Sequence, residues 1–92
     1  MNQVKVWIPP ALREFVDGSV QVDVVACNVT AALAAVGERY PGFLSRVLTP
    51  DGQLRPRVNV FVGEDNIRTR QGLATGLIEG DIVAVIPAVA GG

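Results

Sequence analysis

The sequence predicts an α+β fold in which one main helix packs across one face of a mixed sheet of four to five strands. Segments of alternating apolar and polar residues, typical of strands with one buried face, come in two pairs. One stretch with apolar residues at helical spacing lies between the pairs. With 92 residues the chain has room for one such domain and one hydrophobic core.

The first pair of strands is predicted at residues 3–8 and 20–24. In the first segment valine and isoleucine alternate with Lys5 and Trp7, and two consecutive prolines stop the run. The second segment, VQVDV, alternates in the same way. Residues 9–19 form a long and irregular connection, so we expect the two strands to pair without a tight turn.

The main helix is predicted to begin after Asn28, a favourable N-cap residue. Apolar residues recur at helical spacing from there to Tyr40, and a Pro-Gly pair then ends the helix. Gly37 inside this segment costs about 1 kcal/mol of helix stability relative to alanine, which packing can offset. A short second helical turn is expected at residues 43–48.

The second pair of strands is predicted at residues 57–62 and around Ile67 and Arg68. A turn signal at residues 49–52 and a polar loop precede the first of these strands. Residues 63–66 are expected to form the turn between them. This pair is therefore a second hairpin.

The last strand is predicted at residues 82–86 and ends at Pro87. Because the helix crosses over between the two halves of the chain, we expect the last strand to lie beside the first and parallel to it. One helix across such a sheet is the β-grasp arrangement. We therefore assign residues 1–87 to a β-grasp domain and residues 88–92 to a flexible C-terminal tail.

Composition and charge narrow the classes of function. Hydrophobic residues make up 49% of the chain and charged residues 18%, a mixture typical of a chain that folds. The formal net charge of -1 leaves no basic surplus for phosphates or anionic lipid, so we expect neither nucleic acid nor membranes as partners. The sequence shows no secretory leader and no apolar run of about 20 residues, so we expect a cytoplasmic protein.

The residue types present also exclude several chemistries. The chain has no histidine and one cysteine, so it cannot build a Ser-His-Asp or Cys-His centre or the usual transition-metal sites. We expect no bound metal. The single Cys27 cannot close an internal disulfide and is interpreted as a small buried residue before the helix. The alternative is a thioester or disulfide with a partner, since a helix N-terminus favours the thiolate. Arg13, Arg68 and Arg70 are interpreted as ordinary solvated surface.

The chain after Pro87 carries no bulky side chain and no charge apart from the terminal carboxylate. Such a segment can thread a narrow channel, and two final glycines let partner atoms approach the carboxylate without a Cβ in the way. The alternative is an ordinary frayed end, because chain termini are commonly disordered and a Gly-Gly ending alone has little specificity. The residues predicted to thread a partner's active site are Ala88, Val89, Ala90 and Gly91, with Gly92 as the carrier of the reactive carboxylate.

The C-terminal run GLATGLIEGDIVAVIPAVAGG resembles the signature of the MoaD/ThiS ubiquitin-like sulfur carriers. In that family a glycine-aspartate turn, here Gly80 and Asp81, enters the last strand. A proline, here Pro87, closes the strand, and a Gly-Gly pair follows. The hairpin VNVFVGEDNIR and the helix that ends in Tyr-Pro-Gly also resemble the family, so the resemblance covers nearly the whole chain.

The resemblance implies that this protein is a cosubstrate and not an enzyme. An E1-like adenylyltransferase of the MoeB/ThiF type would use ATP and magnesium to convert the Gly92 carboxylate into an acyl-adenylate. Sulfur would then replace the adenylate and give a thiocarboxylate, a usable sulfur nucleophile. The protein itself would bind no cofactor and would be a monomer when free.

Within the family, the pair Leu12-Arg13 and the ending AVAGG look most like the cysteine-biosynthesis carriers of actinobacteria. That subgroup implies a pyridoxal-phosphate cysteine synthase as sulfur acceptor and a zinc JAMM-type peptidase that releases cysteine. Three related functions remain open: the small subunit of molybdopterin synthase, a thiamine carrier, and a carrier for a thio-containing natural product. Two further classes are a protein modifier joined to lysines and an interaction domain with an inert tail.

A docking surface for partners is predicted on the sheet face away from the helix. Phe61 points opposite to its neighbours in the strand, which places an aromatic ring on that face. Trp7 and Ile86 are expected on the same face. An exposed apolar patch of this kind can mark a partner surface.

Overall fold

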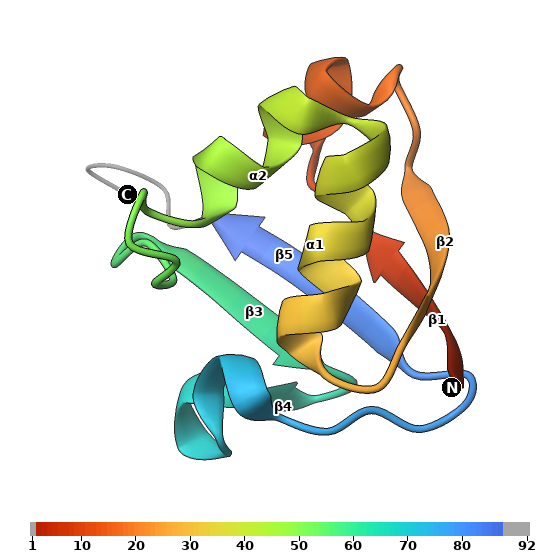
Figure 1. Cartoon of the computed structure of the whole chain (residues 1–92), viewed down its shortest axis with the longest axis vertical. Helices are drawn as coiled ribbons and strands as arrows, with labels where there is room; N and C mark the ends of the chain where they lie inside the picture. Colours follow the sequence, from red (N-terminus) through yellow and green to blue (C-terminus); the bar gives the residue numbers. More distant parts are fainter. Residues whose placement is uncertain (1, 88–92) are drawn as a thin grey trace.

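The structure, a computed structural model, describes residues 2–87. Gly92, the predicted sulfur carrier, and residues 88–91, predicted to thread a partner's active site, lie outside this range. One mixed sheet has the strand order β2-β1-β5-β3-β4, as Figure 1 shows. The strands are β1 (Asn2–Trp7), β2 (Gln21–Ala26), β3 (Val58–Val62), β4 (Asp65–Asn66) and β5 (Ile82–Pro87).

The topology confirms the predicted β-grasp. β1 and β2 pair antiparallel, and β5 lies between β1 and β3, parallel to the first and antiparallel to the second. The parallel pair is in register at Val6 and Val83. Because a parallel pair needs a crossover and not a tight turn, the helical segment between the two hairpins produces this arrangement.

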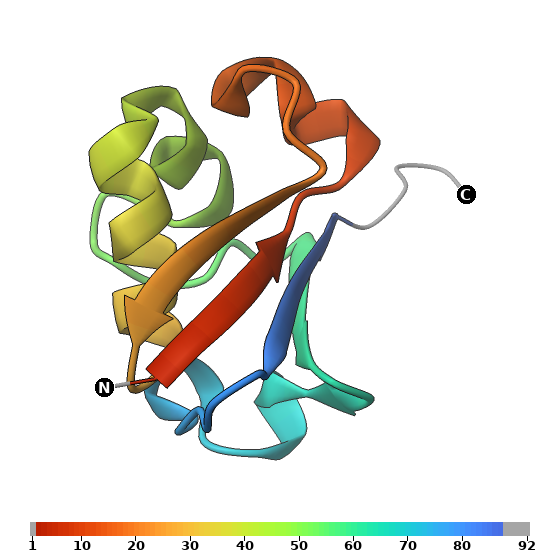
Figure 2. The ribbon, with the colours of Figure 1, turned by 90° about the vertical axis from the view of Figure 1, so that its right-hand side faces the viewer.

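Two helices cover one face of the sheet, α1 (Val29–Arg39) and α2 (Pro41–Val47) (Figures 1 and 2). Asn28 caps α1 as predicted, and its side-chain oxygen accepts the backbone N–H of Ala31 at 2.8 Å. The expected second helical turn is confirmed as α2. An added Cβ on Gly37 would lie 3.0 Å from the Cβ of Leu44, so glycine lets the two helices pack closely.

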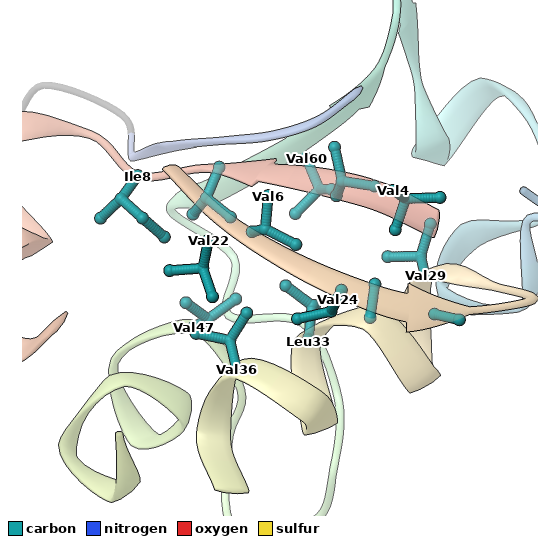
Figure 3. Packing of buried hydrophobic residues seen from close by; sticks show 14 of the residues in the cluster. Val4, Val6, Ile8, Val22, Val24, Val29, Leu33, Val36, Val47 and Val60 are labelled. Carbon is teal, nitrogen blue, oxygen red and sulfur yellow. The ribbon is translucent and has the colours of Figure 1, made fainter. Parts of the chain in front are cut away.

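The hydrophobic core fills the space between the sheet and these helices. Alternate residues of β1 and β2 point toward α1, among them Val6 and Val24, and Figure 3 shows them meeting Leu33 and Val36 of that helix. The strand alternation and the helical spacing read from the sequence thus identify the two surfaces that form the core. No helix of residues 2–87 is long and apolar enough to cross a membrane.

The connection between β1 and β2 is more ordered than the sequence indicated. Pro10–Val16 forms a 3-10 helix, and its Leu12 and Val16 are buried in the core. The turn after it contains Asp17 at a positive φ of 55°, followed by Gly18. Two apolar residues four apart give too short a pattern to predict a helix.

The predicted position of the fourth strand is wrong by two residues. Gly63, at a φ of 60°, makes the turn after β3 tight, so Val62 already pairs with Asp65. The strand is therefore Asp65–Asn66, and the predicted strand residues Ile67 and Arg68 belong to a 3-10 helix, Ile67–Thr69. The Asn66 side chain accepts the backbone N–H of Arg68 at 2.9 Å and begins that helix.

Candidate functional site

The strand that leads toward the C-terminus lies in the middle of the sheet. β5 has β1 on one side and β3 on the other, and its last residue, Pro87, is in register with Val58 of β3. A proline lacks the backbone N–H that a central strand normally uses, so it is tolerated here at the strand's end. Whatever follows Pro87 therefore begins at a position that β3 fixes, since the pairing of β5 with β1 ends at Ala84.

The sheet face away from the helices carries an apolar surface, as predicted. Phe61 alternates with buried neighbours in β3 and is itself half-buried, and Trp7 of β1 is half-buried as well. Both are in register with Ala84 of β5, so the small alanine lies between the two aromatic residues in one row across the sheet. Ile86 and Ile82 lie on the same strand face, 42% and 50% exposed.

We call Trp7, Phe61, Ile82, Ala84 and Ile86 the outer patch. The sequence analysis identified three of these residues and missed Ile82 and Ala84. The signal was present, since both alternate with the buried Val83 and Val85 of the same strand. That the outer patch docks a partner stays a prediction.

Charged residues border the outer patch. The guanidinium of Arg13 lies 5.5 Å from the centre of the Trp7 ring, and its Nε donates to the carbonyl oxygen of Ile8 at 3.0 Å. Arg13 is thus held against the patch and is not free surface as expected. On the same face, Lys5 of β1 is exposed and stands opposite Ile82 in register, with Asp23 of β2 on its other side.

The prediction that Cys27 is buried is wrong: its side chain is exposed. Ala26, the last residue of β2, takes the core position, and the next residue turns outward before the helix cap. The backbone of Cys27 is used structurally, because its carbonyl oxygen accepts the N–H of Leu77 at 2.9 Å. Within residues 2–87 the structure places no group of three His, Cys, Asp or Glu side chains where they could hold a metal ion.

The fold is shared with solved structures of sulfur carriers. CysO of Mycobacterium tuberculosis matches with a TM-score of 0.87 over 94% of this chain and 99% of that chain, at 33% identity. A chain in the BexX/CysO complex of Amycolatopsis orientalis matches with a TM-score of 0.90 over 97% of this chain and 99% of that chain, at 32% identity.

Sequence comparison leads to the same group of proteins. The chain is 35% identical to the sulfur carrier protein CysO of Mycobacterium tuberculosis over 91 residues, which cover 97% of this chain and 98% of that protein. It is 38% identical over 65 residues to small archaeal modifier protein 3 of Haloferax volcanii, covering 71% of this chain and 70% of that protein. The ThiS family matches residues 6–92, and this chain belongs to that family of ubiquitin-like sulfur carriers.

Proposed function

We propose that this protein carries sulfur as a thiocarboxylate on Gly92 and donates it in the biosynthesis of cysteine. A MoeB/ThiF-type adenylyltransferase would activate the carboxylate with ATP and magnesium, and sulfide would displace the adenylate. A carboxylate is a poor electrophile, and the mixed anhydride with AMP supplies the leaving group that the displacement needs. The observation that carries the proposal is the ThiS family match, which continues through Gly92.

The described geometry suits a protein that presents its end to a partner's active site. Ile86 of the outer patch immediately precedes Pro87, so the proposed docking surface and the start of the last five residues adjoin. Five residues extend at most about 18 Å, which limits how far the partner's nucleotide site can lie from Pro87. We propose that the outer patch docks the adenylyltransferase while the last five residues enter that site.

Intact mass spectrometry tests the sulfur chemistry. The protein is incubated with the adenylyltransferase, ATP and sulfide, beside a variant that lacks Gly92. We expect a mass gain that corresponds to replacement of one oxygen by sulfur in the intact chain and none in the shortened one. If the mass stays unchanged although the same adenylyltransferase activates its own carrier protein, the proposal is refuted.

The exposed thiol of Cys27 needs a control in this test. The variant Cys27→Ser leaves the thiocarboxylate as the sole sulfur nucleophile of the chain, since the one methionine is a thioether. Iodoacetamide should therefore alkylate Cys27→Ser only after activation, and at the C-terminal peptide. Alkylation before activation would mean that the reagent does not report thiocarboxylate.

The acceptor is the finer part of the proposal, and the CysO relatives support it. The thiocarboxylate form is mixed with a pyridoxal-phosphate cysteine synthase and an activated serine derivative. We expect a carrier–cysteine adduct, which a zinc JAMM-type peptidase then cleaves to cysteine and the free carrier. If the thiocarboxylate is consumed instead by a molybdopterin precursor, a thiamine precursor or a natural-product intermediate, the cysteine assignment is wrong.

A second candidate function is modification of other proteins, which the match to small archaeal modifier protein 3 favours. The same activated carboxylate would then form an isopeptide bond with a lysine of a target. The chain has one lysine of its own, Lys5, which is exposed. Chains of this protein linked through lysine would therefore use Lys5, and Lys5→Arg should abolish them. Conjugates of higher mass in cells would support this alternative over sulfur transfer.

A further inference from the structure

The start of β3 holds the end of β5. Val58 and Pro87 are the last register pair of these two strands. At the other end of the ladder Gly63 donates its N–H to the carbonyl oxygen of Ile82 at 3.1 Å, and bonded pairs recur at every second residue of an antiparallel ladder. Val58 and Pro87 are therefore a non-bonded pair, and Val58 turns its backbone N–H and C=O away from β5.

β4 is too short to reach those two groups, because its two residues pair with Phe61 and Val62 only. The side chain of Arg68 takes the place of a longer strand. Its Nη2 donates to the carbonyl oxygen of Val58 at 2.8 Å and to that of Arg55 at 3.2 Å. The carbonyl oxygen of Arg55 also accepts the N–H of Val58 at 3.0 Å. Residues 55–58 thus form a turn, and one guanidinium binds the carbonyl oxygens at both of its ends.

The same turn is tied to the end of α2. Arg55 donates its backbone N–H to Val47 at 3.0 Å and its Nε to Ser45 at 2.9 Å, in both cases to the carbonyl oxygen. Hydrogen bonds from a charged donor are stronger than those between neutral groups. The two arginines thereby connect the start of β3 to the helical layer as well as to the segment after β4.

We propose that Arg68 is a positioning residue for the C-terminal segment. By holding the start of β3, it fixes the point at which β5 ends and the segment that carries Gly92 begins. This inference rests on the proposed function of Gly92. If the start of β3 frays, the end of β5 frays with it, and Pro87 no longer keeps a fixed position beside the outer patch. The carboxylate then spends less time in the geometry required for reaction.

Amide hydrogen exchange by NMR on the free protein tests whether Arg68 holds the start of β3. The variant Arg68→Gln is compared with Arg70→Gln, whose arginine is two residues away and pairs with Asp65 at 3.0 Å. We expect Arg68→Gln to speed exchange at Asn59 and Ile86, the last bonded pair, at least roughly tenfold, and Arg70→Gln to leave it unchanged. Unchanged exchange in Arg68→Gln would overturn the proposal.

Global destabilisation is separated from local fraying by the centre of the sheet. The exchange rates at Val6 and Val83 report opening of the whole domain. If Arg68→Gln speeds exchange there as well, the milder Arg68→Lys is measured. The proposal requires that the substitution accelerates exchange more at Asn59 and Ile86 than at Val6 and Val83. Equal acceleration at both places would make Arg68 a general stabilising residue and overturn the proposal.

Steady-state kinetics of adenylation, followed by pyrophosphate release at varied carrier concentration, test the consequence. A misplacement of about 1 Å can cost on the order of 100-fold in rate, so we expect Arg68→Gln to lower kcat at least roughly tenfold. KM should change less than kcat, because Ile86 is the one outer-patch residue at the end of β5 that frays and the other four keep their strand pairing. A raised KM with unchanged kcat would instead place Arg68 in the docking surface and overturn the proposal. Failure of the unaltered chain to be adenylated would refute the proposed function. Hydrogen exchange would still show whether Arg68 holds the start of β3.

Discussion

The substitution Phe61→Asp tests the outer patch most directly. Phe61 lies in the row with Trp7 and Ala84, and the residues beside it in β3 are the ones that face the core. Aspartate at this position removes an aromatic ring and adds a charge at the centre of the proposed docking surface. The core packing is left in place, so folding and docking can be measured separately.

The expected effects differ in size. Truncating an aromatic anchor at the centre of an interface costs about 2 kcal/mol or more, which corresponds to about 30-fold in Kd. An aspartate left unpaired in the interface adds to this loss. The free energy of unfolding should fall by only about 1 kcal/mol, from lost cross-strand contacts and poor strand propensity. In a domain of this size that lowers Tm by roughly 4–8 °C.

The matched control is Val25→Asp. Val25 lies on the same sheet face, 49% exposed, but on the edge strand β2 and outside the outer patch. It receives the same charge without loss of any patch residue. Trp7 is the only tryptophan of the chain, so 5-fluorotryptophan labelling gives one 19F resonance inside the patch. Titration of each protein with the adenylyltransferase then yields Kd, and thermal unfolding yields Tm.

Two results would refute the reasoning. If Phe61→Asp folds and binds the adenylyltransferase with the Kd of the unaltered protein, the outer patch is excluded as the docking surface. An equal loss of affinity in Val25→Asp would show that added negative charge, and not the patch, weakens the complex. We expect Val25→Asp to bind within about twofold of the unaltered protein, because charges at the rim of an interface contribute little to affinity.

Two further predictions concern stability, measured by urea unfolding. Asn28→Ala removes the side-chain acceptor of the Ala31 N–H and should cost about 1 kcal/mol, whereas Asn28→Asp should retain the cap; equal stability of the alanine variant would show that the cap contributes nothing. Gly37→Ala gains about 1 kcal/mol of helix propensity but places a Cβ 3.0 Å from the Cβ of Leu44. Overpacking typically costs about 1–3 kcal/mol, so we expect net destabilisation, and a more stable variant would show that α2 moves aside freely.

The sequence alone predicted most of the architecture. The strands at both ends of the chain alternate with period two, and the helix after Asn28 has a clear cap and helical spacing. These patterns are local and repeat over several residues, so they remain visible without any knowledge of contacts. The parallel pairing of β1 with β5 followed from the crossover between them. The Gly-Gly ending and the aromatic residue at position 61 indicated the candidate site because they too are local features of the sequence.

The tertiary structure decided what depends on contacts between distant residues. Leu12 is buried because a 3-10 helix places it in the core, and Cys27 is exposed because Ala26 takes the core position before it. The sequence indicated only a loss of helix stability at Gly37. The close approach of Leu44 from α2 shows that the missing Cβ lets the two helices pack together. Arg68 binds carbonyl groups 10 and 13 residues away. A single side chain that reaches a distant backbone leaves no periodic pattern, because the fold and not the sequence spacing brings the two groups together.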